Sequence, residues 1–175
     1  MPAVTPLCSV DVTDLATWIS AIDFAEWPQQ NRLADGKIRP AMVTSLRWNG
    51  FGDHVDELVD DLTAKLKDFV PDFQPYGAVW ESYNLMLSVV MPGASIEPHC
   101  DKQPDLWRTR VHVPLVSNER AVFVTGDVDH VMHVGTAYMV DTRQEHAVRN
   151  DGVTPRIHFM FDVALYGLGA AVKYG

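Results

Sequence analysis

The sequence predicts a mostly β fold, a double-stranded β-helix or jelly roll of cupin-like type, with two helices packed outside it. Helical periodicity is confined to the first part of the chain, and from Val79 onward short segments alternate with turn residues. Seven or eight such segments are typical of a sandwich or barrel, and amphipathic helices have to cover one of its faces. No repeat or linker divides the 175 residues. We therefore expect one domain over 1–175, helical over about 1–75 and β over about 76–166, with a short C-terminal tail.

Two stretches with helical spacing precede the strands. Residues 11–23 place apolar side chains at i, i+3, i+4 and i+7 behind the candidate N-cap Thr13; these side chains are Leu15, Trp18, Ile19 and Ile22. Residues 53–69 carry a longer apolar stripe, begin with acidic residues that suit the helix dipole, and end before Pro71. Proline and glycine are frequent in 28–52, where we expect loop and one short strand near 42–46.

The second part of the chain is expected to contain eight strands, because turn residues such as Pro92-Gly93, Gly126 and Gly135 separate its apolar segments. The expected strands are 79–91, 94–98, 107–116, 120–125, 130–134, 136–140, 146–149 and 155–165.

Two of these strands, 107–116 and 155–165, carry one apolar face and one face rich in cations. The apolar faces must pack against other parts of the chain. The polar side chains on the opposite faces are Arg108, Arg110, His112, Arg156, His158 and Asp162. Two interpretations of these faces stay open: they are solvated, as is usual in antiparallel sheets, or they line a barrel interior that receives an anion.

Composition and charge narrow the class of protein. Apolar residues make up 47% of the chain and charged residues 21%, which is ordinary for a soluble globular domain. The net charge of -9 makes nucleic acid a poor default partner. Two cysteines are too few for a disulfide framework, and no signal peptide or apolar stretch of membrane-spanning length is recognisable. We therefore expect a cytoplasmic protein with a small-molecule or peptide substrate and no membrane partner.

A candidate metal site starts from residues 98–101, which read Pro-His-Cys-Asp. In an extended strand His99 and Asp101 point to the same side, so that an imidazole and a carboxylate can grip one ion. The third ligand has to come from another strand, and His146, just before a turn, is the best candidate. Two histidines and one carboxylate leave coordination positions open on one side of the metal, as in non-haem Fe(II) oxygenases.

Arg156 follows His146 by ten residues, across the turn Asn150-Asp151-Gly152. A hairpin of that length brings an arginine near a metal held by the histidine. The planar guanidinium suits bidentate binding of a carboxylate. An H-x-D string alone is a weak signal, and its combination with this arginine makes it more specific.

Together these segments resemble a known family. The stretches MPGASIEPHCD, RTRVHVPLV, EHAVRNDG and PRIHFMFDV, in this order within roughly residues 80–165, are similar to the aspartyl/asparaginyl β-hydroxylases, which are Fe(II)- and 2-oxoglutarate-dependent oxygenases. The resemblance implies a jelly roll that uses Fe(II), 2-oxoglutarate and O2. It also implies hydroxylation of an unactivated C–H bond, most often on an amino-acid side chain, with release of succinate and CO2.

The resemblance implies roles at matching positions as well. His99 and His146 match iron ligands, and Arg156 matches the residue that binds the distal carboxylate of 2-oxoglutarate. Further co-substrate contacts at matching positions are Arg110, His112 and Ser88. The mammalian members lack a carboxylate at the position of Asp101, so this chain is more similar to shorter bacterial members with a complete triad. The mammalian substrate, a domain resembling epidermal growth factor, is therefore not carried over, and a peptide, protein, free amino acid or other metabolite stays open.

Other polar residues on these segments carry weaker signals. His130 and His133 do not share a strand face and are expected to be ordinary hairpin residues, and Arg108 is expected to be solvated. Four residues stay candidates: His158 for a substrate or co-substrate contact, and Trp80, Tyr83 and Asn84 for the mouth of a substrate site. A contact with a substrate carboxylate is the alternative to solvation for Arg108.

Two competing interpretations come from other classes of protein. A cupin-type isomerase, lyase or small-molecule sensor would keep the three metal ligands but would not need Arg156 and Arg110. A non-catalytic binding domain would have no reason to keep both the ligands and the arginines.

Overall fold

The computed structural model describes residues 2–20, 41–45, 52–66, 79–101 and 107–166. Its elements are β1 Val4–Ser9, α1 Thr13–Ser20, β2 Ala41–Ser45, α2 Gly52–Leu66, β3 Val79–Val90, β4 Ser95–His99, β5 Trp107–Val116, β6 Ala121–Thr125, β7 Val128–Val131, β8 Thr136–Val140, β9 His146–Asn150 and β10 Arg156–Tyr166. The predicted ends of both helices, at 21–23 and 67–69, and the predicted tail lie outside the described residues.

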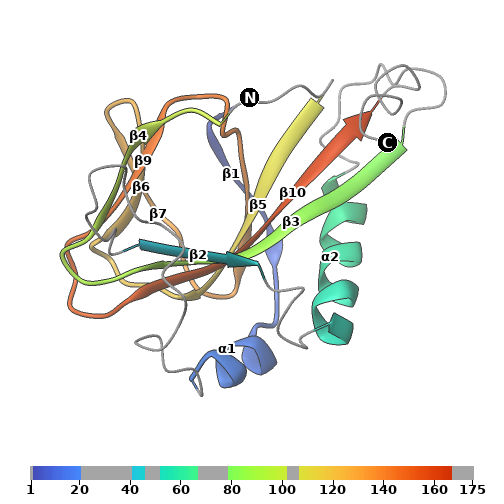
Figure 1. Cartoon of the computed structure of the whole chain (residues 1–175), viewed down its shortest axis with the longest axis horizontal. Coiled ribbons are helices and arrows are strands. Elements are labelled where there is room, and N and C mark those ends of the chain that lie inside the picture. Colours follow the sequence, from blue (N-terminus) through green and yellow to red (C-terminus); the bar gives the residue numbers. More distant parts are fainter. Residues whose placement is uncertain (1, 21–40, 46–51, 67–78, 102–106, 167–175) are drawn as a thin grey trace.

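The strands form two antiparallel sheets that face each other. The larger sheet has the order β1-β8-β5-β10-β3-β2 and the smaller one the order β4-β9-β6-β7. Figure 1 shows the two helices on the far side of the larger sheet from the smaller one. This arrangement confirms the predicted jelly roll with two outer helices. No helix among these residues is long and apolar enough to cross a bilayer.

Two strands differ from the prediction. β1 was not predicted, because Pro6 interrupts the apolar pattern of Val4–Ser9. Among the described strands β1 lies at the edge of the larger sheet and pairs with β8, and an edge position tolerates a residue without an N–H group. β7 starts at Val128 instead of the predicted residue 130, because Gly126, with φ 55°, and Asp127 close a two-residue hairpin.

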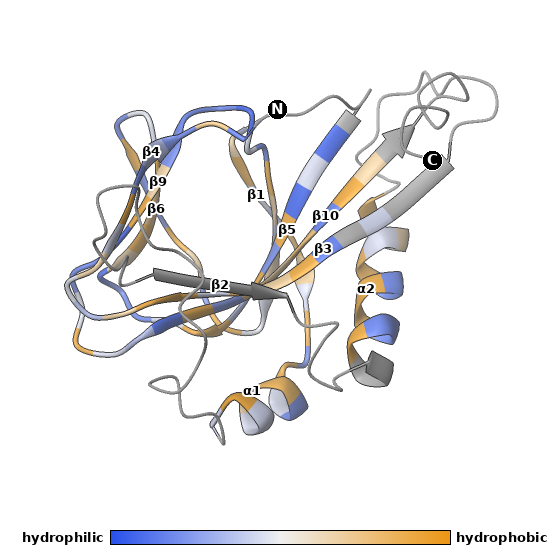
Figure 2. Ribbon diagram, in the orientation of Figure 1, coloured by the Kyte–Doolittle hydropathy of each residue, from blue (hydrophilic) through white to orange (hydrophobic). Residues whose placement is uncertain are grey.

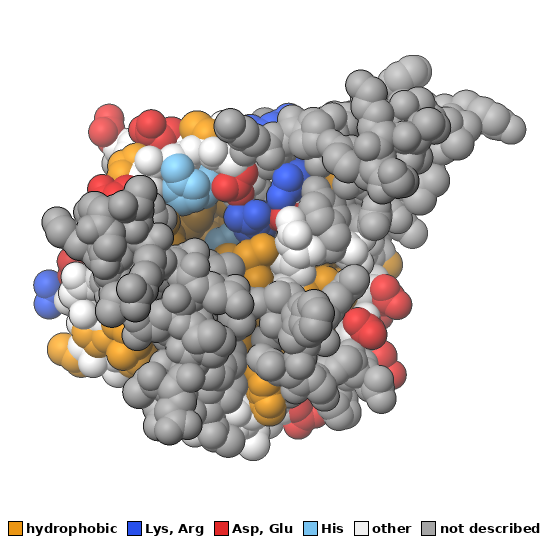
Figure 3. Space-filling view, in the orientation of Figure 1, with side chains coloured by type: hydrophobic (Ala, Val, Ile, Leu, Met, Phe, Trp, Pro, Cys, Tyr) orange, Lys and Arg blue, Asp and Glu red, His pale blue; other side chains and the backbone are white. Residues whose placement is uncertain are grey.

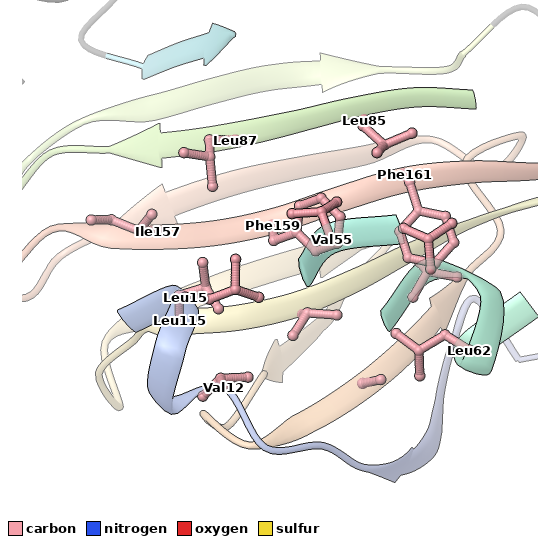
Figure 4. Close-up of a cluster of buried hydrophobic side chains, with 14 of the residues drawn as sticks. Val12, Leu15, Val55, Leu62, Leu85, Leu87, Leu115, Ile157, Phe159 and Phe161 are labelled. Atoms are coloured by element: carbon pink, nitrogen blue, oxygen red, sulfur yellow. The ribbon is translucent and has the colours of Figure 1, made fainter. Parts of the chain in front are cut away.

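The main hydrophobic core lies between the larger sheet and the helices. The apolar faces of β5 and β10 pack there against Leu15 of α1 and Leu62 of α2. Figure 4 shows Phe159 and Phe161 directed from β10 toward this layer, and Figure 2 shows the hydrophobic side of α2 turned to the sheet. Burying each large aliphatic or aromatic side chain contributes about 1.5–3 kcal/mol. This core fixes which face of β5 and β10 points away from the helices.

The opposite faces of β5 and β10 point into the space between the sheets. His112 of β5 packs edge-on against Phe123 of β6, with 5.5 Å between ring centroids, so it contacts the other sheet directly. A smaller apolar cluster surrounds this contact and includes Val90, Tyr138 and Val148. The cationic faces therefore line the interior, and the alternative of solvated faces is wrong.

Candidate active site

Three potential metal ligands meet at one end of the smaller sheet. His99 ends β4, His146 begins β9, and the two residues are paired across these strands. Asp101 follows two residues later, and its N–H donates to the carbonyl of Thr142 at 2.9 Å, which holds the chain beside the connection between β8 and β9. One ligand atom from each of the three residues lies within 4.8 Å of the others. The structure thus brings together the three residues that the sequence selected.

Hydrogen bonds orient both imidazoles in the same way. Nδ1 of His99 lies 2.7 Å from the carbonyl oxygen of Glu97, and Nδ1 of His146 lies 2.9 Å from that of Gln144. A carbonyl only accepts, so each Nδ1 carries the proton and each Nε2 keeps its lone pair. A metal-binding histidine usually donates its other N–H in this way. Nε2 of His99 also lies 3.9 Å from Oδ1 of Asp101, so these potential ligand atoms fit one divalent cation.

Burial favours the neutral form of His146, one of the candidate ligands. Burial is the main cause that lowers the pKa of His146, and the hydrogen bond to Gln144 opposes this shift only in part. Phe123 stacks on the imidazole at 5.2 Å and 15°. Neutral imidazole is the form that binds metal ions, so the environment favours ligation near neutral pH.

Arg110 connects Asp101 to the interior of the larger sheet. Its Nη1 lies 2.7 Å from Oδ2 of Asp101, which leaves Oδ1 on the side of His99. Its Nε and Nη2 donate to Asp162 at 2.8 and 3.0 Å. The guanidinium of Arg110 is therefore shared between two carboxylates.

Asp162 is the centre of a buried polar network that the sequence analysis missed. It is fully buried and accepts hydrogen bonds from Arg108, Arg110 and Asn84. Asn84 has φ 54°, beside a register shift between β3 and β10, and this bulge turns its amide to Asp162. Arg108 is only 8% exposed, so the expectation that it is solvated is wrong. The period-two alternation that includes Arg156 and His158 places Asp162 on the same face of β10. Its partners on β3 and β5 are not visible in this pattern.

Arg156 begins β10 and is a buried cation. It is 1% exposed, and burial lowers the pKa of its guanidinium to about 9. No carboxylate among the described residues pairs with it, and its Nη2 lies 3.0 Å from Nδ1 of His158. A buried charge without a counterion is unfavourable, so this position suits an anionic ligand.

Two neutral histidines lie between Arg156 and the ligand cluster. Nδ1 of His158 lies 3.4 Å from Nδ1 of His112. Burial lowers the pKa of both imidazoles well below the usual value, and Arg156 adds to this shift. Their Nε2 atoms are buried and have no hydrogen-bond partner within the part of the chain that the structure describes. Ser88 of β3 is buried directly opposite His158. The Arg156 guanidinium, the Ser88 hydroxyl and an imidazole N–H fit an anion with several oxygen atoms.

Figure 3 shows a hollow in one face of the molecule, where histidine, cationic and acidic side chains gather. His130 and His133 lie elsewhere: His130 is within 2.8 Å of the Thr125 hydroxyl, and His133 is 63% exposed. The side chains of Trp80 and Tyr83 lie outside the described residues, so their predicted contacts stay predictions.

Comparisons with known proteins agree with this arrangement. A family model described as aspartyl/asparaginyl β-hydroxylase matches residues 42–165, more than half of the chain. No curated protein gives a significant match.

Three solved structures share this fold. A viral collagen prolyl hydroxylase from Paramecium bursaria chlorella virus-1, in complex with 2-oxoglutarate, has a TM-score of 0.64 and 14% identity over 93% of this chain and 95% of that chain. A protein of the 2-oxoglutarate-Fe(II) oxygenase family from Burkholderia pseudomallei has a TM-score of 0.66 and 14% identity over 93% and 84%. SnoN, a non-haem α-ketoglutarate-dependent epimerase of nogalamycin biosynthesis, has a TM-score of 0.64 and 13% identity over 93% and 78%. At these identities the likeness shows the fold alone, whereas the family match covers the motifs themselves. The chain therefore belongs to the aspartyl/asparaginyl β-hydroxylase family of 2-oxoglutarate-dependent oxygenases.

Proposed function

We propose that this chain is an Fe(II)- and 2-oxoglutarate-dependent dioxygenase that hydroxylates an unactivated C–H bond. The observation that carries the proposal is the convergence of His99, Asp101 and His146, whose ligand atoms lie within 4.8 Å of one another. Both Nε2 atoms keep a lone pair with which they can bind a metal ion. In this proposal the three residues would hold Fe(II) and leave coordination positions for a co-substrate and O2. When bound, Fe(II) with 2-oxoglutarate and O2 would supply the oxidising chemistry, with release of succinate and CO2.

The co-substrate is proposed to lie against the cationic interior of the larger sheet. Arg156 would bind its distal carboxylate, because this guanidinium is buried and no described carboxylate neutralises it. Ser88 and His112 would add hydrogen bonds, since both lie on the same interior face. Arg110 is also proposed as a co-substrate contact. In addition, its Nη1 holds Oδ2 of Asp101.

The protein's own share of catalysis is orientation and exclusion of water. The ligand His146 is buried under Phe123, and the interior residues Arg156, His112 and His158 are almost completely inaccessible. Charges inside such a site interact more strongly than in water, so a dianion is bound in one orientation. His99 is the exposed ligand, and substrate is proposed to approach from its side.

For the substrate we propose an amino-acid side chain, in a peptide, a protein or a free amino acid. The family description names aspartyl and asparaginyl residues, and a similarly folded neighbour is a collagen prolyl hydroxylase. Succinate release, measured across free amino acids, peptides and small metabolites, is the screen that tests this class. Substrate-dependent succinate without a hydroxylated product would contradict hydroxylation.

An anaerobic titration tests the proposed site directly. Fe(II) plus 2-oxoglutarate should give a weak visible charge-transfer band, because the co-substrate chelates the metal. His146→Ala should abolish the band, and Arg156→Ala should greatly raise the 2-oxoglutarate concentration that it needs. Metal-loaded, folded wild-type protein without this band would contradict the oxygenase proposal and favour a cupin-type isomerase, lyase or sensor.

A further inference from the structure

His158 is buried in the interior, yet neither the proposed metal site nor the proposed co-substrate contacts include it. It is 0% exposed and lies two residues after Arg156 on the same face of β10. Its Nδ1 is the described hydrogen-bond partner of Arg156 Nη2, at 3.0 Å. The two side chains therefore share an environment and orient each other.

The arginine determines which nitrogen of His158 is protonated. A guanidinium only donates hydrogen bonds, so Nδ1 of His158 has to accept and the proton resides on Nε2. A protonated imidazole would present an N–H to a buried cation, and the arginine opposes that charge. The ring is thus a neutral acceptor for the arginine and keeps a donor at Nε2.

Neighbouring elements hold the ring of His158 in place. It packs edge-on against His112 at 5.6 Å and 86°, and His112 in turn packs against Phe123 of the smaller sheet. The backbone of His158 is paired with Ser88 on one side and Pro114 on the other. A ring held against His112, which itself contacts the smaller sheet, has little freedom to lose when its neighbour binds a ligand.

The start of β10 is anchored as well. Asn150, before the turn, donates from Nδ2 to the carbonyls of Val90 and Thr154 at 2.9 and 2.8 Å. Val90 is the residue paired with Arg156. The backbone of Arg156 is therefore fixed, and the direction of its long side chain depends on contacts further along it.

Resting on the proposed function, we propose that His158 is a positioning residue, which uses its Nδ1 lone pair to aim Arg156 at the distal carboxylate of 2-oxoglutarate. Without this acceptor, one guanidinium N–H is buried without a partner and the side chain can rotate away. The loss falls on the distal carboxylate only, because the 2-oxo acid end is held at the metal.

Three substitutions separate this role from packing. His158→Leu fills the space without an acceptor, and His158→Asn places an amide oxygen near the position of Nδ1. His158→Gln, with its acceptor further out, takes the place of the leucine variant if that variant does not fold. His133→Asn, at an exposed histidine, is the matched control.

The measurement is the anaerobic charge-transfer band of the Fe(II)-loaded protein, titrated with 2-oxoglutarate and with pyruvate, which lacks the distal carboxylate. His158→Leu should raise the half-saturating 2-oxoglutarate concentration about tenfold, the scale of one hydrogen bond to a charged group. His158→Asn should stay within about threefold of wild type, and the Fe(II) and pyruvate titrations should not change.

Other results would overturn the inference. Equal shifts for 2-oxoglutarate and Fe(II) binding would mean general damage to the site, and unchanged 2-oxoglutarate binding in His158→Leu would mean that Arg156 needs no support. Wild-type protein without the band would instead refute the proposed function, so the two failures are distinguishable.

Discussion

Single side chains in this site depend on partners that are themselves charged. Arg110 is placed between Asp101 and Asp162, so its loss should let the Asp101 carboxylate rotate away from His99. We expect Arg110→Gln to weaken Fe(II) or Mn(II) binding about 10–100-fold, the range for supporting groups around metal ligands. Metal titration of the purified protein measures this, with the exposed Arg120→Gln as control. Unchanged metal affinity would show that Asp101 needs no support from Arg110.

We expect Asp162 to contribute to the free energy of unfolding. Its buried carboxylate accepts from two arginines and one asparagine. Asp162→Asn keeps the shape but removes the carboxylate that the buried Arg108 and the partly buried Arg110 share. We expect a loss of about 3–5 kcal/mol in the free energy of unfolding. Urea denaturation measures it, and the exposed Asp127→Asn should change stability by less than about 0.5 kcal/mol.

The two interior histidines predict how stability depends on pH. Burial lowers the pKa values of His112 and His158, so below about pH 6.5 the unfolded chain takes up protons that the folded chain does not. Their contribution is thus fully present above that pH and is lost as the pH falls. In metal-free protein, unfolding free energies between pH 7.5 and 5.5 should drop by at most about 1.4 kcal/mol per pH unit for each histidine. His158→Asn should reduce this slope; an identical slope would mean that His158 is not responsible.

Strands β5 and β10 show which features of the fold and the site can be predicted from sequence patterns. Period-two alternation on β5 and β10 separates the residues of the helix-covered core from those of the site, because side chains on a strand point to opposite faces. The pattern cannot say which face is solvated, since that depends on a second sheet contributed by distant residues such as Phe123. The H-x-D string and His146 give the three residues that converge in the candidate metal site. The pairing of Asp101 with Arg110 depends on tertiary placement and is not visible in local spacing.

Helix α2 lies behind the larger sheet and should influence stability separately from the site. Leu62 is completely buried in the layer between α2 and the sheet. We expect Leu62→Ala to lower the free energy of unfolding by about 2–5 kcal/mol through lost burial and a cavity. Metal affinity at 25 °C should stay within about threefold of wild type, because additive effects are usual for distant sites. The exposed Lys65→Ala on the same helix is the control. A large loss of metal affinity in Leu62→Ala would show that the core and the site are coupled.

At the scale of the molecule, the two sheets contribute different halves of the proposed site. The smaller sheet carries His99 and His146, and the larger one carries Arg110, Arg156 and the interior histidines. Metal binding alone would therefore join β4 to β9 within one sheet. A co-substrate held by both the metal and Arg156 would join the two sheets across the interior.

Thermal unfolding should show this division between the sheets. Anything that binds only the folded state stabilises it, by about 2.7 kcal/mol at a ligand concentration 100 times its dissociation constant. For a domain of this size that corresponds to a rise in Tm of about 5–10 °C. We expect Mn(II) to raise Tm in wild type and in Arg156→Met, and 2-oxoglutarate to add a second increment in wild type only. His146→Ala should lose both increments, because the co-substrate needs the metal. If 2-oxoglutarate raised the Tm of Arg156→Met as much as that of wild type, the larger sheet would not contribute the anion-binding half of the site.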